Sequence, residues 1–98
     1  MRLLLSREAE ADLEQIGDHI ARDNPGRALS FVLELRERAG KLLSAPQAYP
    51  LVPRYEAGGV RRCVHGNYLI FYRLNGPDVE VLRVIHGAMD YEQLLFPE

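Results

Sequence analysis

Three apolar segments separated by short turn signals occupy the second half of the chain, and they constrain its fold more than any other feature. VRRCVH ends at Gly66-Asn67, YLIFYRL ends at the NGPD sequence of residues 75–78, and VEVLRVIH ends at Gly87. Short turns rich in glycine and asparagine typically join antiparallel strands. The sequence therefore predicts a three-stranded antiparallel meander.

The first half of the chain has the apolar spacing of two amphipathic helices. Ser6 is placed to cap the first helix, whose apolar stripe recurs at steps of three and four residues: Ala9, Leu13, Ile16 and Ile20. Asn24-Pro25 ends this helix and begins a second one, with the stripe Ala28, Val32, Leu35, Ala39 and Leu42. A short link between two such helices predicts an antiparallel hairpin.

The remaining segments complete a predicted α+β fold. Residues 2–5, RLLL, indicate a strand that we expect at one edge of the sheet, and residues 88–95 indicate a short terminal helix. The order β-α-α-β-β-β, followed by that helix, predicts an antiparallel sheet packed under a helical hairpin. With 98 residues, the chain is expected to form one domain, residues 1–98.

Composition and charge exclude several functional classes. The formal net charge is −2, so no global positive field attracts nucleic acid. Cys63 is the only cysteine, which excludes an internal disulfide and a cysteine-based metal cluster. The chain has no apolar run near the ~18 residues of a membrane span, and its N-terminal run is too short for a signal peptide. We therefore expect a protein of the cytoplasm.

Strand alternation divides the meander into two faces without deciding which one the helices cover. Leu69 and Phe71 point one way, whereas Tyr68, Ile70 and Tyr72 point the other. One arrangement places the helices over Leu69, Phe71, Leu82 and Val84 and leaves an open face that carries Tyr68, Tyr72, Arg62 and Arg83. Such a face is either a binding surface or an ordinary hydrated sheet face.

His86 stands at the end of the last predicted strand, directly before Gly87. It can hydrogen-bond backbone groups at the turn, whereas catalysis would require a carboxylate, a second base or a metal beside it. His19 and His65 have no metal-ligand spacing with it, and no phosphate-binding glycine motif is present. The sequence thus favours a structural role for His86 and Gly87 and predicts no metal and no cofactor.

The whole chain resembles the RelE/ParE superfamily of bacterial toxins, and more closely its ParE branch. The resemblance rests on the order of elements, on GNYLIFYRL at 66–74 and above all on VLRVIHGAMDYEQLL at 81–95. It implies the toxin of a type II toxin–antitoxin system, of the kind associated with plasmid stabilisation, held inactive in a hetero-oligomer with a ParD-like antitoxin. ParE-like toxins inhibit DNA gyrase, whereas RelE-like toxins cut messenger RNA on the ribosome.

The basic residues that the resemblance assigns to a ribonuclease are incomplete. An arginine early in the third strand of RelE-like enzymes would fall on Tyr68 or Leu69, and a later one near Ala88, and none of these is basic. A rearranged enzyme would need Arg62 and Arg83 to hold phosphate and His86 as the acid. The resemblance therefore favours a gyrase inhibitor with no catalytic residues, with a ribonuclease and a non-toxic, antitoxin-binding remnant as alternatives.

The resemblance also implies two contact surfaces. We expect contacts with gyrase from the open sheet face and the terminal segment: Arg61, Arg62, Tyr72, Arg83, Asp90, Tyr91, Leu94 and Leu95. An antitoxin helix would lie in an apolar groove near the hairpin and the edge of the first strand, where the candidates are Leu3, Leu5, Leu13, Ile16, Ile20, Leu29 and Val32. Nucleic acid is expected only through the antitoxin or gyrase.

Overall fold

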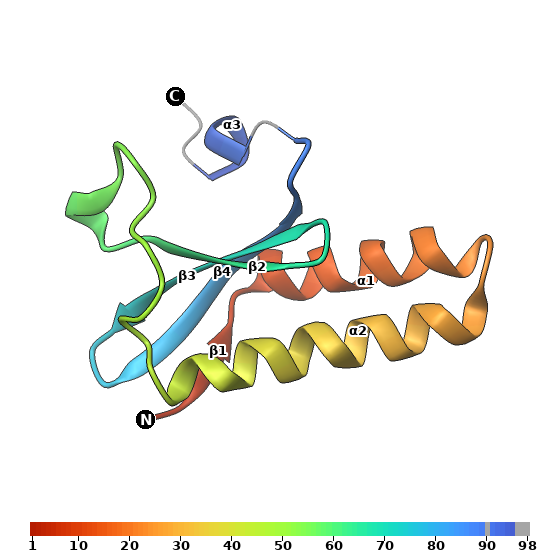
Figure 1. Cartoon of the computed structure of the whole chain (residues 1–98), viewed down its shortest axis with the longest axis horizontal. Helices are drawn as coiled ribbons and strands as arrows, with labels where there is room; N and C mark the ends of the chain where they lie inside the picture. The colour runs from red at the N-terminus through yellow and green to blue at the C-terminus, as the bar shows by residue number, and fades with distance from the viewer. Residues whose placement is uncertain (90, 96–98) are drawn as a thin grey trace.

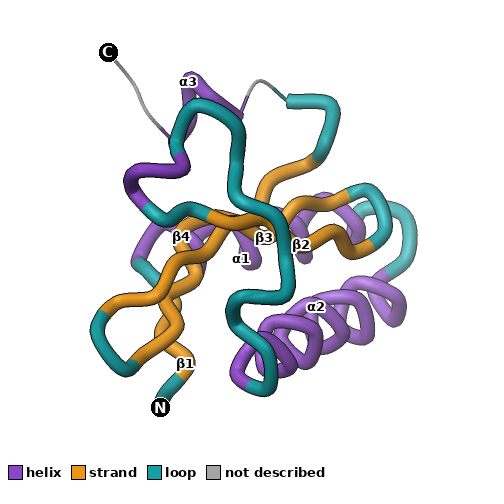
Figure 2. Tube along the Cα trace, turned by 60° about the vertical axis from the view of Figure 1, so that its left-hand side comes forward, coloured by secondary structure: helices purple, strands orange, loops and turns teal. Residues whose placement is uncertain are grey.

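A four-stranded sheet forms the centre of the computed structural model, which describes residues 1–89 and 91–95 (Figure 1). The strands lie in the order β1 (Leu3–Leu5), β4 (Asp78–His86), β3 (Tyr68–Asn75) and β2 (Arg61–His65). Helices α1 (Arg7–Ala21) and α2 (Pro25–Gly40) cover one face. The short helix α3 (Tyr91–Leu95) and the loop before β2, with its 3-10 turn η2 (Glu56–Gly58), lie on the other side (Figure 2). The predicted α+β fold is confirmed.

The bounds of the two long helices follow from local sequence. The Ser6 side chain accepts a hydrogen bond from the Ala9 N–H at 3.0 Å, and the Asn24 side chain accepts one from the Arg27 N–H at 3.1 Å. After Gly40 the chain tightens into the 3-10 turn η1 (Lys41–Leu43), as the low helix propensity of glycine leads one to expect. No helix within the described residues is long and apolar enough to cross a membrane.

Both predicted hairpins are present, and glycine makes each of them possible. Gly66 and Gly76 begin the two-residue turns with φ of 59° and 61°, the position that a type II′ turn gives to glycine. β1 lies at the sheet edge as predicted, but it runs parallel to β4, so the sheet is mixed rather than wholly antiparallel. No turn joins β1 to β4, and local sequence therefore could not determine their relative direction.

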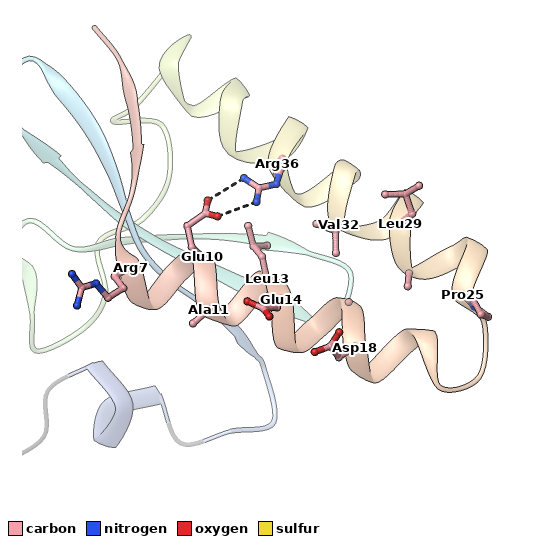
Figure 3. A pocket seen from close by; sticks show the side chains of 12 residues that line it. Arg7, Glu10, Ala11, Leu13, Glu14, Asp18, Pro25, Leu29, Val32 and Arg36 are labelled. Atoms are coloured by element: carbon pink, nitrogen blue, oxygen red, sulfur yellow. Dashed lines mark hydrogen bonds and ion pairs between the residues drawn. The ribbon is translucent and has the colours of Figure 1, made fainter.

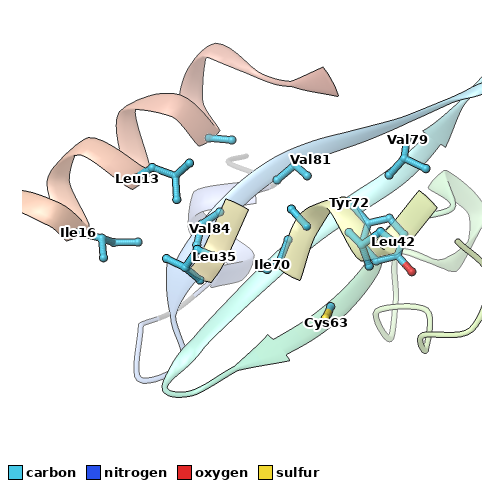
Figure 4. Close-up of a cluster of buried hydrophobic side chains, with 12 residues drawn as sticks. Leu13, Ile16, Leu35, Leu42, Cys63, Ile70, Tyr72, Val79, Val81 and Val84 are labelled. Atoms are coloured by element: carbon cyan, nitrogen blue, oxygen red, sulfur yellow. The ribbon is translucent and has the colours of Figure 1, made fainter. Parts of the chain in front are cut away.

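The helices cover the opposite sheet face from the one in the expected arrangement. The main core contains Tyr72 and Ile70 of β3 beneath the two helices, together with residues from most other elements: Leu13, Ile16, Leu35, Leu42, Cys63, Val79, Val81 and Val84 (Figure 4). Phe71 points to the other face, into a second cluster of Val52, Val60 and Ile85. The expected open face is therefore wrong, because Tyr72 is fully buried and Tyr68 packs against the main core.

A β-bulge at Leu82 explains why simple alternation misplaced the residues of β4. Phe71 pairs with Arg83 and the next residue, Tyr72, pairs with Val81, which leaves Leu82 as an extra residue on β4. The bulge lets Val81 and Val84 share the helix-covered face, while Leu82 packs beside the second cluster. Neither glycine nor proline marks this bulge in the sequence.

Candidate functional site

A groove of about 710 Å³ lies between α1 and α2 and forms the first candidate surface (Figure 3). Its floor is apolar and is formed by Leu13, Gly17, Ala28 and Val32. A Cβ atom added at Gly17 would lie 3.3 Å from a methyl carbon of Val32, so glycine permits the close approach of the two helices here. The groove therefore has an apolar floor where the two helices pack closely.

The two rims of this groove differ in chemistry. Glu10 on α1 and Arg36 on α2 form a two-pronged ion pair, with both N–O distances 3.1 Å, and this pairing lowers the pKa of Glu10. Glu14 and Asp18, farther along α1, make no ion pair with the described part of the chain. Leu29 on α2 is 67% exposed. An apolar floor with charged rims suits the apolar face of an amphipathic helix.

The groove includes three of the seven residues expected to bind an antitoxin, namely Leu13, Leu29 and Val32. Ile16 is buried in the main core, and the other three are half-buried and pack against it: Leu3, Leu5 and Ile20. Both helices that apolar periodicity predicted do line a groove, but periodicity cannot separate side chains that face the sheet from those that line the groove.

The second candidate surface is the sheet face turned away from α1 and α2. The ring of Tyr91 packs on Phe71 with 5.0 Å between centroids, and Leu95 packs against the same cluster. Arg54, an exposed residue with a φ of 78°, forms an ion pair with Glu92 at 3.5 Å and so connects the loop to α3. The centre of this face is therefore covered by the terminal helix and the loop before β2.

Two residues expected on an open face have internal structural contacts instead. The Arg61 guanidinium donates hydrogen bonds to the carbonyl oxygens of Gln47 at 3.3 Å and Tyr49 at 2.7 Å. The Tyr72 hydroxyl donates to the Pro46 carbonyl at 2.8 Å, and burial raises the pKa of Tyr72 to about 12. Both side chains hold the loop that follows α2 against the sheet.

Arg83 is also held from within the fold. Its Nε and Nη2 atoms donate to the carboxylate of Asp12 at 2.7 and 2.9 Å, and the Val84 N–H donates to the same carboxylate at 2.9 Å. The hydrogen bonds between the Arg83 guanidinium and the Asp12 carboxylate raise the pKa of Arg83. Asp12 is buried, with only 8% of it exposed. Its spacing of three residues from Ala9 and four from Ile16, which places it on the apolar stripe, was the signal that sequence reasoning missed.

Arg62 and the terminal segment remain at the second surface. Arg62 is half-buried, and its side chain makes no hydrogen bond or ion pair with residues 1–89 or 91–95. Of the other expected gyrase contacts, Tyr91 and Leu95 lie at this face. Asp90 and the side chain of Leu94 lie outside the described part of the structure.

The three residues that a rearranged ribonuclease would need are divided between the two sheet faces. Arg62 and Arg83 both pair with Phe71, whereas His86 pairs with Tyr68 on the helix-covered face. His86 Nδ1 accepts a hydrogen bond from the Ala88 N–H at 3.1 Å, and its ring packs edge-on against Tyr68 at 5.2 Å. Gly87 follows, donating its N–H to the Asn67 carbonyl at 2.8 Å. His86 and Gly87 therefore organise the turn that leaves the sheet.

Comparisons with known proteins give one consistent family. A family model described as the ParE toxin of the type II toxin–antitoxin system parDE matches residues 3–91. A solved structure of the chromosomal ParDE system from P. aeruginosa is 28% identical, with a TM-score of 0.75 over 88% of this chain and 95% of that one. The RelBE2 toxin–antitoxin complex from Mycobacterium tuberculosis is 26% identical, with a TM-score of 0.60 over 87% and 95% of the two chains. No curated protein matches.

Proposed function

Because this chain belongs to the ParE toxin family of type II toxin–antitoxin systems, we propose that it inhibits DNA gyrase and is neutralised by a ParD-like antitoxin. The single observation that carries the proposal is the family match over residues 3–91. The resemblance of VLRVIHGAMDYEQLL to the ParE branch supports the same function. In this account the 98 residues act as a single toxin domain.

A gyrase inhibitor of this kind needs a binding surface, and we assign that surface to the sheet face that carries α3. Arg62 supplies a cation there without an internal partner in the described chain, and Tyr91 and Leu95 supply apolar contacts. Asp90 and Leu94 belong to the same terminal segment and stay candidates on sequence grounds. Arg61, Tyr72 and Arg83 contribute indirectly, because their hydrogen bonds hold the loop and β4 in position.

The antitoxin is assigned to the groove between α1 and α2. Helix-in-groove recognition requires apolar anchors about one turn apart, and the floor of Leu13, Ala28 and Val32 offers sites for them. We expect one toxin to bind one antitoxin tightly. Co-expression with the protein encoded by the neighbouring gene tests this step, and failure of the two to co-purify would contradict it.

The similarity to the RelBE2 complex supports a second candidate function, ribosome-dependent cleavage of messenger RNA. Such an enzyme would use Arg62, Arg83 and His86, yet the pairing register divides them between two faces and Asp12 engages Arg83. That geometry makes gyrase inhibition the better-supported proposal. If cleavage does occur, Arg62→Ala should abolish it.

Two assays separate the candidate functions. The purified toxin should inhibit plasmid supercoiling by gyrase, and the antitoxin should restore it. Cleavage of messenger RNA on translating ribosomes, with supercoiling unaffected, would instead establish the ribonuclease. A protein that binds antitoxin but causes no growth arrest on expression would be a remnant without toxicity.

A further inference from the structure

The groove between α1 and α2 differs in charge from one end to the other. At the end where α1 begins, Glu10 and Arg36 neutralise each other, and Arg7 adds a positive charge. At the other end, Glu14 and Asp18 stand on the α1 rim, opposite the apolar rim formed by Pro25 and Leu29 (Figure 3). The charge of this second end is therefore −2, with no compensating cation among the groove-lining residues there.

The two acidic residues have a defined spacing. Glu14 and Asp18 are four residues apart on one helix, so they lie in one row, separated by about 6 Å along the axis. A helix lying in the groove would present the flank of its apolar stripe to this row. Two basic residues one turn apart on that flank would match the acids in both charge and spacing.

We propose that Glu14 and Asp18 determine partner specificity by selecting an antitoxin helix that carries two basic residues, one turn apart, beside its apolar stripe. The inference rests on the proposed binding of an antitoxin in this groove. It adds a requirement for the charge of the bound helix, because an apolar floor alone suits many amphipathic helices. An acidic residue at either matching position would be repelled, and this repulsion separates the cognate antitoxin from others. The apolar floor thus provides contact area and the α1 rim provides selectivity.

Each ion pair increases the affinity for the cognate antitoxin only modestly. The repulsion of an antitoxin with the wrong charges is the larger effect. Exposed ion pairs typically strengthen an association by about two- to five-fold each. Like charges brought together at an interface weaken it far more. Neutralising both acids should therefore weaken cognate binding about ten-fold, and reversing both should weaken it about 100-fold or more.

The test measures the Kd of this toxin for the protein encoded by the neighbouring gene. The double variant Glu14→Gln/Asp18→Asn should bind about ten-fold more weakly at low salt, and the difference should shrink in about 0.5 M salt because screening weakens exposed ion pairs. The matched control Asp23→Asn/Glu56→Gln removes the same two charges at exposed sites that do not line the groove. Its Kd should stay within two-fold of that of the wild type.

The outcomes test the charge selectivity separately from antitoxin binding itself. Equal Kd values for wild type and the groove variant, or a wild-type Kd independent of salt, would overturn the inference and leave the antitoxin function standing. No binding by the wild type would overturn both. The variant Glu14→Lys/Asp18→Lys should lose tight binding to the wild-type antitoxin. If replacing the two matching basic residues of the antitoxin with glutamate restores that binding, the contact is established directly.

Discussion

Arg83 donates two hydrogen bonds to the carboxylate of Asp12, at 2.7 and 2.9 Å, and this ion pair joins α1 to the bulge of β4. The carboxylate also accepts the Val84 N–H, in a part of β4 that lies beyond its pairing with β1, which ends at Val81. The Arg83 guanidinium therefore has a structural role in connecting α1 to β4. Its position explains why this toxin presents fewer free cations on the sheet than its sequence suggests.

Removing the carboxylate should destabilise the protein strongly. Asp12→Ala removes the carboxylate that accepts two hydrogen bonds from the half-buried Arg83 guanidinium and one from the Val84 N–H, and we expect the free energy of unfolding to fall by about 3 kcal/mol. Urea unfolding measures the change. Glu14→Gln on the same helix is the control and should change it by less than about 0.5 kcal/mol. A loss below about 1 kcal/mol for Asp12→Ala would contradict this role for the pair.

Tyr72 should make the protein sensitive to alkali. Burial raises its pKa to about 12 from an ordinary value near 10, so above pH 10 the unfolded chain loses a proton that the folded chain keeps. The contribution of Tyr72 to stability should therefore be unchanged below pH 10 and should fall by up to about 3 kcal/mol as the pH rises to 12. Unfolding curves at pH 9 and pH 11.5 measure the loss.

The matched variant for this titration is Tyr72→Phe. It should remove the Tyr72 contribution to the alkaline loss and lower stability near neutral pH by about 1 kcal/mol, because the Pro46 carbonyl loses its hydrogen-bond donor. An alkaline loss of the same size in wild type and variant would assign the titration to another group.

His86→Ala should lower thermal stability without removing an activity. The variant loses the hydrogen bond from the Ala88 N–H and the edge-on contact with Tyr68, together worth about 1 kcal/mol. Thermal melting measures the change. The control is His19→Ala, which alters a histidine at an exposed site. Unchanged melting combined with loss of RNA cleavage would make His86 a catalytic acid instead.

Arg61 and Arg62 are adjacent in β2 and should respond differently to alanine. Arg61→Ala removes two hydrogen bonds to loop carbonyls and should lower the free energy of unfolding by about 1–2 kcal/mol. Arg62→Ala should leave stability nearly unchanged and weaken inhibition of gyrase about ten-fold, because we assign this side chain to the target. Full inhibition by Arg62→Ala would remove Arg62 from the binding surface.

The sequence was sufficient for the elements and insufficient for the faces of the sheet. Ser6, Asn24-Pro25, Gly66 and Gly76 act through their own backbone neighbourhoods, so caps and turns could be predicted locally. The placement of Tyr72 depends on how the sheet packs against helices distant in sequence, and the face of each β4 residue depends on the bulge at Leu82. These features arise from tertiary packing, for which strand alternation carries no information.

The candidate site shows the same division. Periodicity predicted the two helices that line the groove proposed for the antitoxin, but Gly17, Glu14 and Asp18 become part of this groove only when the two helices pack together. Arg83 was recognised as a basic residue on β4, whereas its partner Asp12 is 71 residues away in the chain. Contacts at that separation follow from the fold and not from any local pattern.

The most direct test of the account incubates gyrase with supercoiled plasmid, ATP and this toxin, and then denatures the enzyme so that trapped double-strand breaks appear as linear DNA. The account predicts that linear DNA accumulates with toxin concentration and that prior addition of the antitoxin prevents it. Plasmid that remains unbroken at a several-fold excess of toxin over gyrase would contradict the account.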